Sequence, residues 1–444
     1  MTESGLGAGG PIDEATFRRI WDQIKAPARV LLAVSGGSDS MALMRLAAPL
    51  HRSGRSRIDI ATVDHGLRAG AREEAAFVGR AAGELGLRHD ILEWTGRKPK
   101  AGVQEAAREA RYFLLAERAL RLDAEAIITA HTADDQAETV LMRAARGSGP
   151  RGLGAMSPDT LVAAGPSAPL RLLRPLLDVR RQRLIEYLER AGASFIDDPS
   201  NRDPSFERVR VRSVLGRLER ENVLSVDALV MTAAEMRAAA GRLTACENDR
   251  FAALEGAFDA FGGVALRTET VSEDDAPLIA RLVAAVSGAK RRTTDSAALA
   301  TLQSAQRQGR STLGGALIRI DDAIRICREP ASLLGRSGAA ASGPHPIGAR
   351  ACILWDRRFI VRNDMDAEGV VRPLGQEARK LAAAVEDEPA LMAAPGLWVR
   401  GRLVAAAGAS DAATPLAEER FFRPVNRFEQ SDTFVNAAGG AALP

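Results

Sequence analysis

Short apolar runs and longer one-sided apolar patterns alternate along the first half of the chain. The short runs predict buried strands, and the segments with apolar residues on one face predict amphipathic helices. Predicted strands cover residues 30–34, 58–65, 88–94, 126–131 and 170–177. Predicted helices cover residues 12–25, 70–85, 103–122, 133–146 and 178–191, and a further helix begins near Met41. Because strands and helices alternate, we expect an α/β fold: an open, mainly parallel sheet with helices on both faces.

The pattern changes near residue 224. Alanine-rich helical spacing covers 225–254, and residues 276–307 predict at least two more helices. Residues 312–328 and 347–363 alternate like strands. We therefore expect a helical segment and then a smaller, strand-rich C-terminal region.

Two segments rich in Gly, Ala, Ser and Pro interrupt these elements. Residues 147–169 are typical of a long mobile loop, and residues 334–348 of a loop or linker. The whole pattern predicts three domains: an α/β domain over 1–222, a helical domain over 223–310 and an α+β domain over 311–444.

Three of the predicted strands end in polar clusters. These are Ser35–Ser40, Asp64–Arg68 and His131–Glu138. The carboxyl ends of parallel strands share one edge of a sheet, and ligands bind there at the point where the strand order reverses. The sequence therefore predicts a single active site that all three clusters surround.

The first cluster is a glycine-rich turn between a strand and a helix. Such a turn directs free backbone N–H groups and the positive end of a helix at one spot, which suits a phosphate group. An ordinary turn capped by Asp39 or Ser40 is the alternative. The phosphate-binding G-x-x-x-x-G-K-[ST] and the dinucleotide-binding G-x-G-x-x-G motifs do not occur in it.

The other two clusters carry candidate ligands. Asp64 and His65 could contact a nucleoside, or form a capping turn. Asp135 and Glu138, three residues apart on a helix, share a face and could hold Mg²⁺ or an ammonium group. Acidic residues that only compensate the helix dipole are the alternative.

Arginines supply candidate phosphate contacts. Arg108 and Arg111 lie one turn apart on a predicted helix, where a solvated helix face is the alternative. Arg146 and Arg151 flank a glycine-rich segment that could cover a nucleotide or RNA, or be an ordinary exposed loop.

Composition excludes several classes of protein. The net charge of +3 predicts only local basic surfaces, and the three cysteines have no metal-ligand spacing, which argues against zinc and iron–sulfur sites. The N-terminal residues lack the basic and apolar regions of a signal peptide, and no apolar run approaches the length of a membrane span. We expect a cytoplasmic protein with no membrane partner.

The motif SGGSDS at 35–40 resembles the signature of PP-loop ATP pyrophosphatases, whose fold is Rossmann-like. Together with VDHGLR, HTADDQAET, RGSGPRGLGAM and DDPSNRDPSFERVRVR, in this order, it is similar to the tRNA(Ile)-lysidine synthetase family. The set spans roughly residues 35–212. One departure is Val209, where the family usually has Asn, which puts that position's usual contact in doubt.

The resemblance implies a ligase that uses ATP and Mg²⁺ to join L-lysine to the wobble cytidine of a tRNA(Ile) with a CAU anticodon. It implies that the first cluster binds ATP with Asp64 and His65, and that Asp39 also holds the metal. Asp135 and Glu138 would bind lysine, and Arg111 and His131 would complete the catalytic set. The first cluster comprises Ser35, Gly36, Gly37, Ser38, Asp39 and Ser40.

Further arginines would contact phosphate or tRNA. These are Arg108, Arg146, Arg151, Arg208 and Arg212, with local tracks over 208–220 and 290–292. A homodimer is compatible with the sequence. A tRNA thiolase is disfavoured because no cysteine precedes residue 246, and a tRNA-binding protein without catalysis is disfavoured by the intact Ser and Asp residues.

Overall fold

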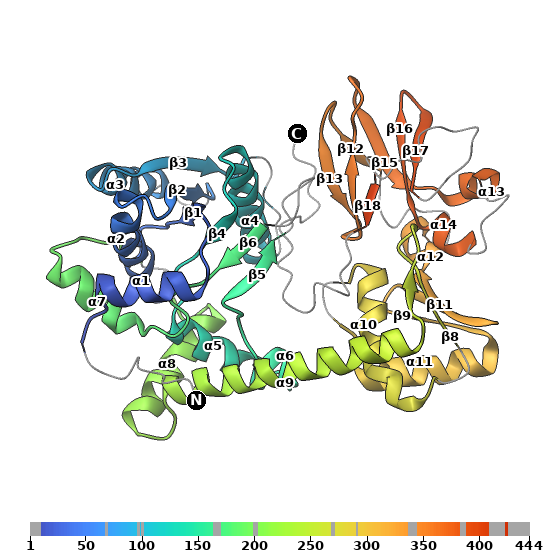
Figure 1. Cartoon of the computed structure of the whole chain (residues 1–444), viewed down its shortest axis with the longest axis horizontal. Helices are drawn as coiled ribbons and strands as arrows, with labels where there is room; N and C mark the ends of the chain where they lie inside the picture. The colour runs from blue at the N-terminus through green and yellow to red at the C-terminus, as the bar shows by residue number, and fades with distance from the viewer. Residues whose placement is uncertain are drawn as a thin grey trace. The chain divides into compact units, whose positions relative to one another are not determined.

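The computed structural model describes residues 10–66, 70–95, 98, 102–162, 170–198, 203–267, 271–289, 292–335, 344–381, 388–407 and 422–424. The chain forms two compact units that divide between Arg242 and Leu243 (Figure 1). No helix in these ranges offers the long apolar surface that crossing a lipid bilayer needs. Several sequence predictions fall outside the described residues, namely those on Arg68, 163–169, 199–202, Lys290 and Arg291.

The first unit is built on a six-stranded sheet with the order β3-β2-β1-β4-β6-β5. Its strands are β1 (Arg29–Ala33), β2 (Arg57–Asp64), β3 (Arg88–Glu93), β4 (Ala126–Ile128), β5 (Asp159–Val162) and β6 (Leu170–Leu173). Every neighbouring pair is parallel except β5 with β6. The mainly parallel sheet is confirmed. The strand order reverses at β1, which lies between β2 and β4.

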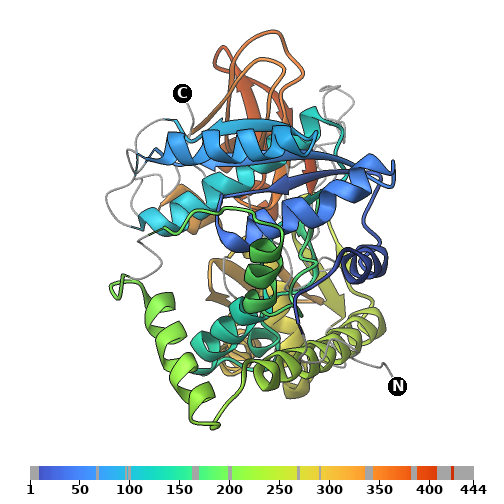
Figure 2. The same ribbon diagram turned by 90° about the vertical axis from the view of Figure 1, so that its left-hand side faces the viewer.

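Different helices cover the two faces of this sheet (Figures 1 and 2). They are α1 (Glu14–Gln23), α2 (Ser38–Arg52), α3 (Ala71–Glu84) and α7 (Arg181–Arg190) on one face and α4 (Val103–Arg121) on the other. Helices α5 (Ala133–Ala144), α6 (Pro150–Leu153) and α8 (Glu207–Arg220) share a separate apolar cluster. Because side chains alternate along a strand, Val30 and Leu32 pack with α1, α2, α3 and α7, whereas Leu31 packs with α4. Two apolar layers thus enclose the strands, as predicted for helices on both faces.

The prediction of one long loop over 147–169 is wrong for its described part. Helix α6 and strand β5 lie there, and β5 forms the antiparallel edge of the sheet. Thr160 and Val162 are buried while Asp159 is exposed, which is the alternation of a strand. A four-residue strand among glycines and serines is too short to stand out in the hydropathy pattern.

The long helix α9 (Val226–Ala253) contains the boundary between the units. The second unit contains a five-stranded sheet, β7-β8-β11-β10-β9, which shares a core with α10 (Ala276–Ser287) and α11 (Asp295–Gln308). Its strands are β7 (Ala257–Phe258), β8 (Val264–Arg267), β9 (Arg310–Leu313), β10 (Ala316–Ile320) and β11 (Ala323–Arg328). Strands β7 and β8 lie in the segment expected to be helical. This sheet therefore joins strands from both sides of residue 310, and the three-domain division stays a prediction.

Two smaller antiparallel sheets complete the second unit, as the strand-rich prediction requires. One has the order β12-β15-β16-β17 and the other β13-β14-β18. Their strands are β12 (His345–Ile347), β13 (Cys352–Trp355), β14 (Phe359–Arg362), β15 (Gly369–Pro373), β16 (Pro395–Val399), β17 (Arg402–Ala406) and β18 (Phe422–Pro424). Short helices are α12 (Pro330–Leu334), α13 (Ala378–Leu381) and α14 (Glu388–Met392).

Candidate active site

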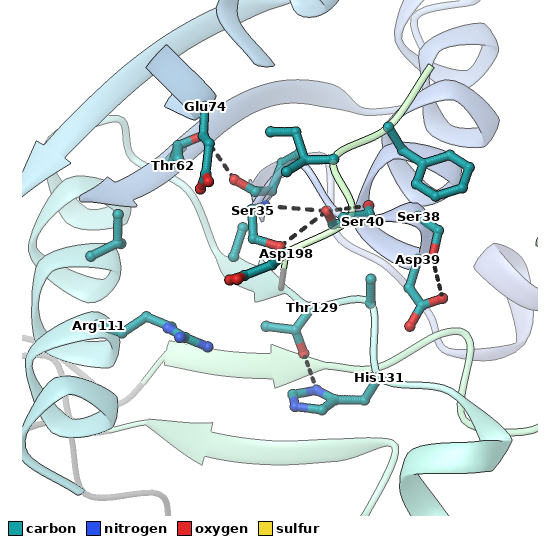
Figure 3. Close-up of a pocket in the computed structure, with 18 of the residues that line it drawn as sticks. Ser35, Ser38, Asp39, Ser40, Thr62, Glu74, Arg111, Thr129, His131 and Asp198 are labelled. Carbon is teal, nitrogen blue, oxygen red and sulfur yellow. Dashed lines mark hydrogen bonds between the residues drawn. The ribbon is translucent and has the colours of Figure 1, made fainter. Parts of the chain in front are cut away.

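A cavity of about 830 Å³ lies at the carboxyl ends of β1, β2 and β4, where the strand order reverses (Figure 3). The residues that follow all three strands contribute to its wall, among them Ser35, His65 and His131. The prediction that the three polar clusters surround one site is therefore met by the geometry. Parallel strands bring these segments together although up to 96 residues of sequence separate them.

The glycine-rich turn is held closed by the hydroxyl of Ser40. This hydroxyl accepts the backbone N–H of Ser35 at 3.2 Å and donates to the carbonyl of Gly37 at 2.9 Å. Gly37 caps α2 without a side-chain hydrogen bond, so no side chain occupies the cap position at the start of the helix. That geometry suits a phosphate group. Ser40 itself is buried and is used to shape the turn.

Gly36 has two reasons to be glycine. Its φ of +91° is a conformation that L side chains rarely adopt, and a Cβ there would lie 2.5 Å from Cδ1 of Ile196. The Gly36 carbonyl also accepts the Ile196 N–H at 2.9 Å. The segment that carries Asp197 and Asp198 is thereby packed onto the turn, and both aspartates line the cavity.

Arg181, at the start of α7, connects the turn to α5. Its Nε donates to Oδ2 of Asp39 at 2.8 Å, and its Nη2 donates to Oδ1 of Asp135 at 3.2 Å. Glu138 lies 3.9 Å from Nη1 of the same guanidinium. This arginine could not be predicted from the sequence, because nothing distinguishes it from the nearby Arg180 and Arg183.

Glu138 is buried at 1% exposure and lies between two arginines of α8. Nε of Arg208 donates to its Oε2 at 2.7 Å, and Nε of Arg212 donates to its Oε1 at 2.6 Å. Arg208 also lies 3.4 Å from Oδ1 of Asp135. The charges of this group balance, because it contains three carboxylates and three guanidinium groups. They belong to Asp39, Asp135 and Glu138 and to Arg181, Arg208 and Arg212.

Asp135 has both a local and a long-range role. Its Oδ2 accepts the backbone N–H of Thr132 at 2.9 Å, and the Thr132 hydroxyl caps α5 in return. A role only at the start of the helix was the alternative interpretation of Asp135, and the cap that it forms uses one carboxylate oxygen. Although burial alone would raise it, Arg181 and Arg208 keep the pKa of Asp135 below its usual value.

Asp39 has the opposite shift. Burial raises the pKa of the Asp39 carboxyl, and the charge of nearby Asp135 adds to the effect while Arg181 opposes it. Its Oδ1 is bound among the described residues only by the hydroxyl of Ser38, 3.3 Å away. This oxygen, beside the start of α2, is the one that a cation shared with a phosphate would use.

Two neutral histidines line the cavity. Burial lowers the pKa of His131 well below its usual value, and its Nδ1 lies 2.9 Å from the hydroxyl of Thr129. Burial and the charge of Arg111 lower the pKa of His65 to about 4. Both rings therefore keep an acceptor nitrogen at neutral pH.

Arg111 reaches from α4 into the cavity (Figure 3). Its Nη2 lies 3.5 Å from Nε2 of His65, and no carboxylate of the described residues pairs with it. Arg108, one turn earlier, stacks over the ring of Tyr112 at 5.1 Å and does not line the cavity. Of the two predicted helix arginines, Arg111 has the environment of an anion ligand.

The remaining predicted residues lie outside the lining. Asp64 accepts the N–H of Gly66 at 2.8 Å, which matches the capping-turn alternative. Arg146 forms an exposed ion pair with Glu207 at 2.5 Å, and Arg151 lies on α6. The lining residues that sequence reasoning missed include several polar or aromatic side chains that were not singled out: Thr62, Glu74, Tyr112, Thr129, Phe195 and Arg181.

The segment after α6 is fixed by side chains that bind its backbone. Gln136 both donates to the carbonyl and accepts the N–H of Met156, each at 2.8 Å. Nη1 of Arg143 donates to the carbonyl of Gly152 at 2.7 Å, and Nη1 of Arg237 on α9 donates to that of Gly154 at 2.8 Å. The glycine-rich segment is thus tied to α5 and to α9.

Within the described ranges, no group of three or more His, Cys, Asp or Glu side chains is arranged to hold a metal ion. Magnesium commonly uses one or two carboxylates with substrate phosphates and water. A single carboxylate at Asp39, next to a phosphate-binding turn, fits that donor set.

Comparisons with known proteins agree with this geometry. Residues 12–219 match the PP-loop domain family. A tRNA(Ile)-lysidine synthase of Bradyrhizobium sp. (strain BTAi1) is 49% identical over 213 residues, which are 48% of this chain and 58% of that protein. The same enzyme of Ruegeria pomeroyi is 35% identical over 409 residues, 89% of this chain and 92% of that protein.

The match to a third relative reaches almost its full length. The tRNA(Ile)-lysidine synthase of Methylobacterium nodulans is 40% identical over 356 residues, 74% of this chain and 98% of that protein. The matched region spans only 58% of the Bradyrhizobium sp. protein, and the same share of a second relative from Bradyrhizobium diazoefficiens. Since two relatives are matched over more than nine-tenths of their length, this chain belongs to the tRNA(Ile)-lysidine synthase family.

Proposed function

We propose that the chain is an ATP-dependent ligase that joins L-lysine to C2 of the wobble cytidine, position 34, of the CAU-anticodon tRNA(Ile). The products are lysidine, AMP and pyrophosphate, and the modified tRNA reads AUA in place of AUG. The observation that carries the proposal is the cavity where the strand order reverses, lined by the glycine-rich turn. Membership of the family supplies the substrate class.

The turn and Arg111 would bind the ATP phosphates. The start of α2 favours negative charge, and so does the guanidinium of Arg111, with which no carboxylate of the described residues pairs. Both can stabilise charge that builds up during nucleotidyl transfer. Asp39 would hold Mg²⁺, which when bound neutralises phosphate charge. The neutral ring of His65 would contact the nucleoside.

Two displacements would follow in order. The cytidine O2 attacks the α-phosphorus, a P–O bond to pyrophosphate breaks, and an O-adenylated base forms. The lysine ε-amine, having lost its proton, then attacks C2, and the C–O bond to AMP breaks. A base modified at C2 must leave any stack, which suits an unpaired anticodon nucleotide.

Asp135 and Glu138 remain our candidates for binding the lysine ammonium group. Their arginine partners are themselves cations, so an ammonium there would take the place of Arg208 or Arg181 on a carboxylate. His131, neutral and next to Asp135, would accept a hydrogen bond from the nucleotide.

The tRNA would contact arginines around the cavity. Candidates are Arg108 on α4, Arg146 after α5, Arg151 on α6, and Arg208 and Arg212 on α8, of which only Arg212 is among the described lining residues. A cytoplasmic location follows from these substrates and is part of the proposal. The proposal also includes a homodimer, as an assembly to be tested.

The first test is incorporation of labelled lysine into CAU-anticodon tRNA(Ile), with AMP and pyrophosphate measured alongside. ATP-dependent incorporation with release of both products is expected. Pyrophosphate release without lysine incorporation would place the nucleophile elsewhere, and bound tRNA without any ATP cleavage would make the chain a binding protein. Asp135→Asn is expected to abolish lysine transfer, and near-normal transfer in that variant would remove Asp135 from the site.

A further inference from the structure

We propose that Arg181 is a positioning residue, which fixes the orientation of Asp39 by tying it to Asp135 on α5. The proposal rests on the proposed function, because it concerns the adenylation step. The guanidinium binds Asp39 at 2.8 Å and Asp135 at 3.2 Å. One side chain therefore joins the helix that follows β1 to the helix that follows β4.

The side chain of Arg181 has no part in starting its own helix. Arg181 is the first residue of α7, and its backbone N–H is bound by Oδ2 of Asp134 at 2.7 Å. The side chain instead extends to the cavity wall, where it is 21% exposed. Partial shielding from water strengthens the Coulomb attraction between this guanidinium and the two carboxylates.

Removal of this cation would leave Asp39 and Asp135 close together without the counter-charge that they share. Arg208, Glu138 and His131 would still surround Asp135, whereas Asp39 has no other charged partner among the described residues. The freed Asp39 carboxylate would no longer be held in one orientation. Since small displacements at a reacting centre lower turnover more than binding, the loss is expected in kcat.

The test compares Arg181→Met with Arg181→Lys and with the control Arg183→Met. Arg183 lies on the same helix, but its Nε binds the carbonyl of Gly10 at 2.8 Å and it does not line the cavity. Pyrophosphate release from ATP is measured with CAU-anticodon tRNA(Ile) present. Thermal unfolding midpoints are measured with Asp39 present and with Asp39→Asn, because replacing Asp39 removes one end of the ion pair.

Arg181→Met is expected to lower kcat at least about tenfold while KM for ATP changes less than about threefold. Arg181→Lys should recover part of kcat, since an ammonium reaches one carboxylate at a time. Arg183→Met should stay close to the original protein. Arg181→Met should lower the unfolding midpoint less when Asp39 is already replaced by Asn.

Equal kcat values for Arg181→Met and Arg183→Met would overturn the proposal. A loss confined to KM would also overturn it, as would an equal drop in the midpoint for Arg181→Met with and without Asp39→Asn. If the original protein releases no pyrophosphate, the proposed function fails instead. The unfolding measurements then still decide whether Arg181 holds the two carboxylates.

Discussion

At the scale of single residues, the site depends on side chains whose chemistry is visible in the sequence and on partners that are not. The glycine-rich turn and His131 could be singled out because their residue types and spacing are unusual for a turn. Arg181 could not, since an arginine in a run of arginines carries no local mark. Its role arises only because α7 begins beside two strand ends.

Gly36→Ala tests how strictly the turn is defined. The substitution combines a positive φ with a Cβ 2.5 Å from Ile196, so a loss of about 1–3 kcal/mol in the free energy of unfolding is expected, with weaker ATP binding. Gly192 also has a positive φ, but a Cβ there would meet no atom within 4 Å. Gly192→Ala therefore measures the cost of the backbone conformation alone. Urea unfolding of both variants checks this. Equal losses would show that the contact with Ile196 has no cost.

His131 should make the folded protein sensitive to acid. Its pKa in the folded state lies well below the ordinary 6.5, so the unfolded chain takes up a proton first as the pH falls. The stabilisation of the folded state that depends on a neutral His131 is fully present above about pH 6.5 and is lost progressively below it. His131→Gln is expected to flatten the fall of the unfolding free energy between about pH 6.5 and 4.5, measured by urea titration. Parallel curves for the two proteins would contradict this.

At the scale of elements, long periodic segments were predicted well and short ones were not. Every strand of the parallel part of the first sheet was expected, because each is a short segment with apolar residues that a helix follows. Among the missed strands, β5, β7, β8 and β12 have two to four residues, too few for a pattern of alternation. Pairing with another strand of the sheet decides their structure, and no local signal announces it.

The segment after α6 is an element without regular structure, and its backbone contacts should hold it in place. Arg237→Met leaves the carbonyl of Gly154 without this donor, and a loss of about 1–2 kcal/mol is expected. Amide exchange over residues 152–156 should become faster. Arg242→Met, on the exposed side of the same helix, should change neither quantity. Unchanged exchange in Arg237→Met would show that Gln136 and Arg143 suffice.

At the scale of the molecule, a net charge of +3 argues that RNA contacts are local. The log of the tRNA association constant should fall with log salt by about 0.7 for each phosphate contacted in a single-stranded region. Arg217→Gln on α8 should reduce that slope by the amount that about one phosphate contact contributes, whereas Arg190→Gln on α7 should leave the slope unchanged. Filter binding over a salt series measures both. A slope that neither substitution alters would move the footprint away from α8.

The cations around the cavity have one further consequence. Among the described lining residues, every cationic side chain is an arginine. An adenylated base is an electrophile, which any primary amine within reach could capture. A guanidinium stays protonated and is not a nucleophile at neutral pH. Under the proposed reaction, arginine supplies positive charge without competing with free lysine, so the protein avoids becoming attached to its own substrate.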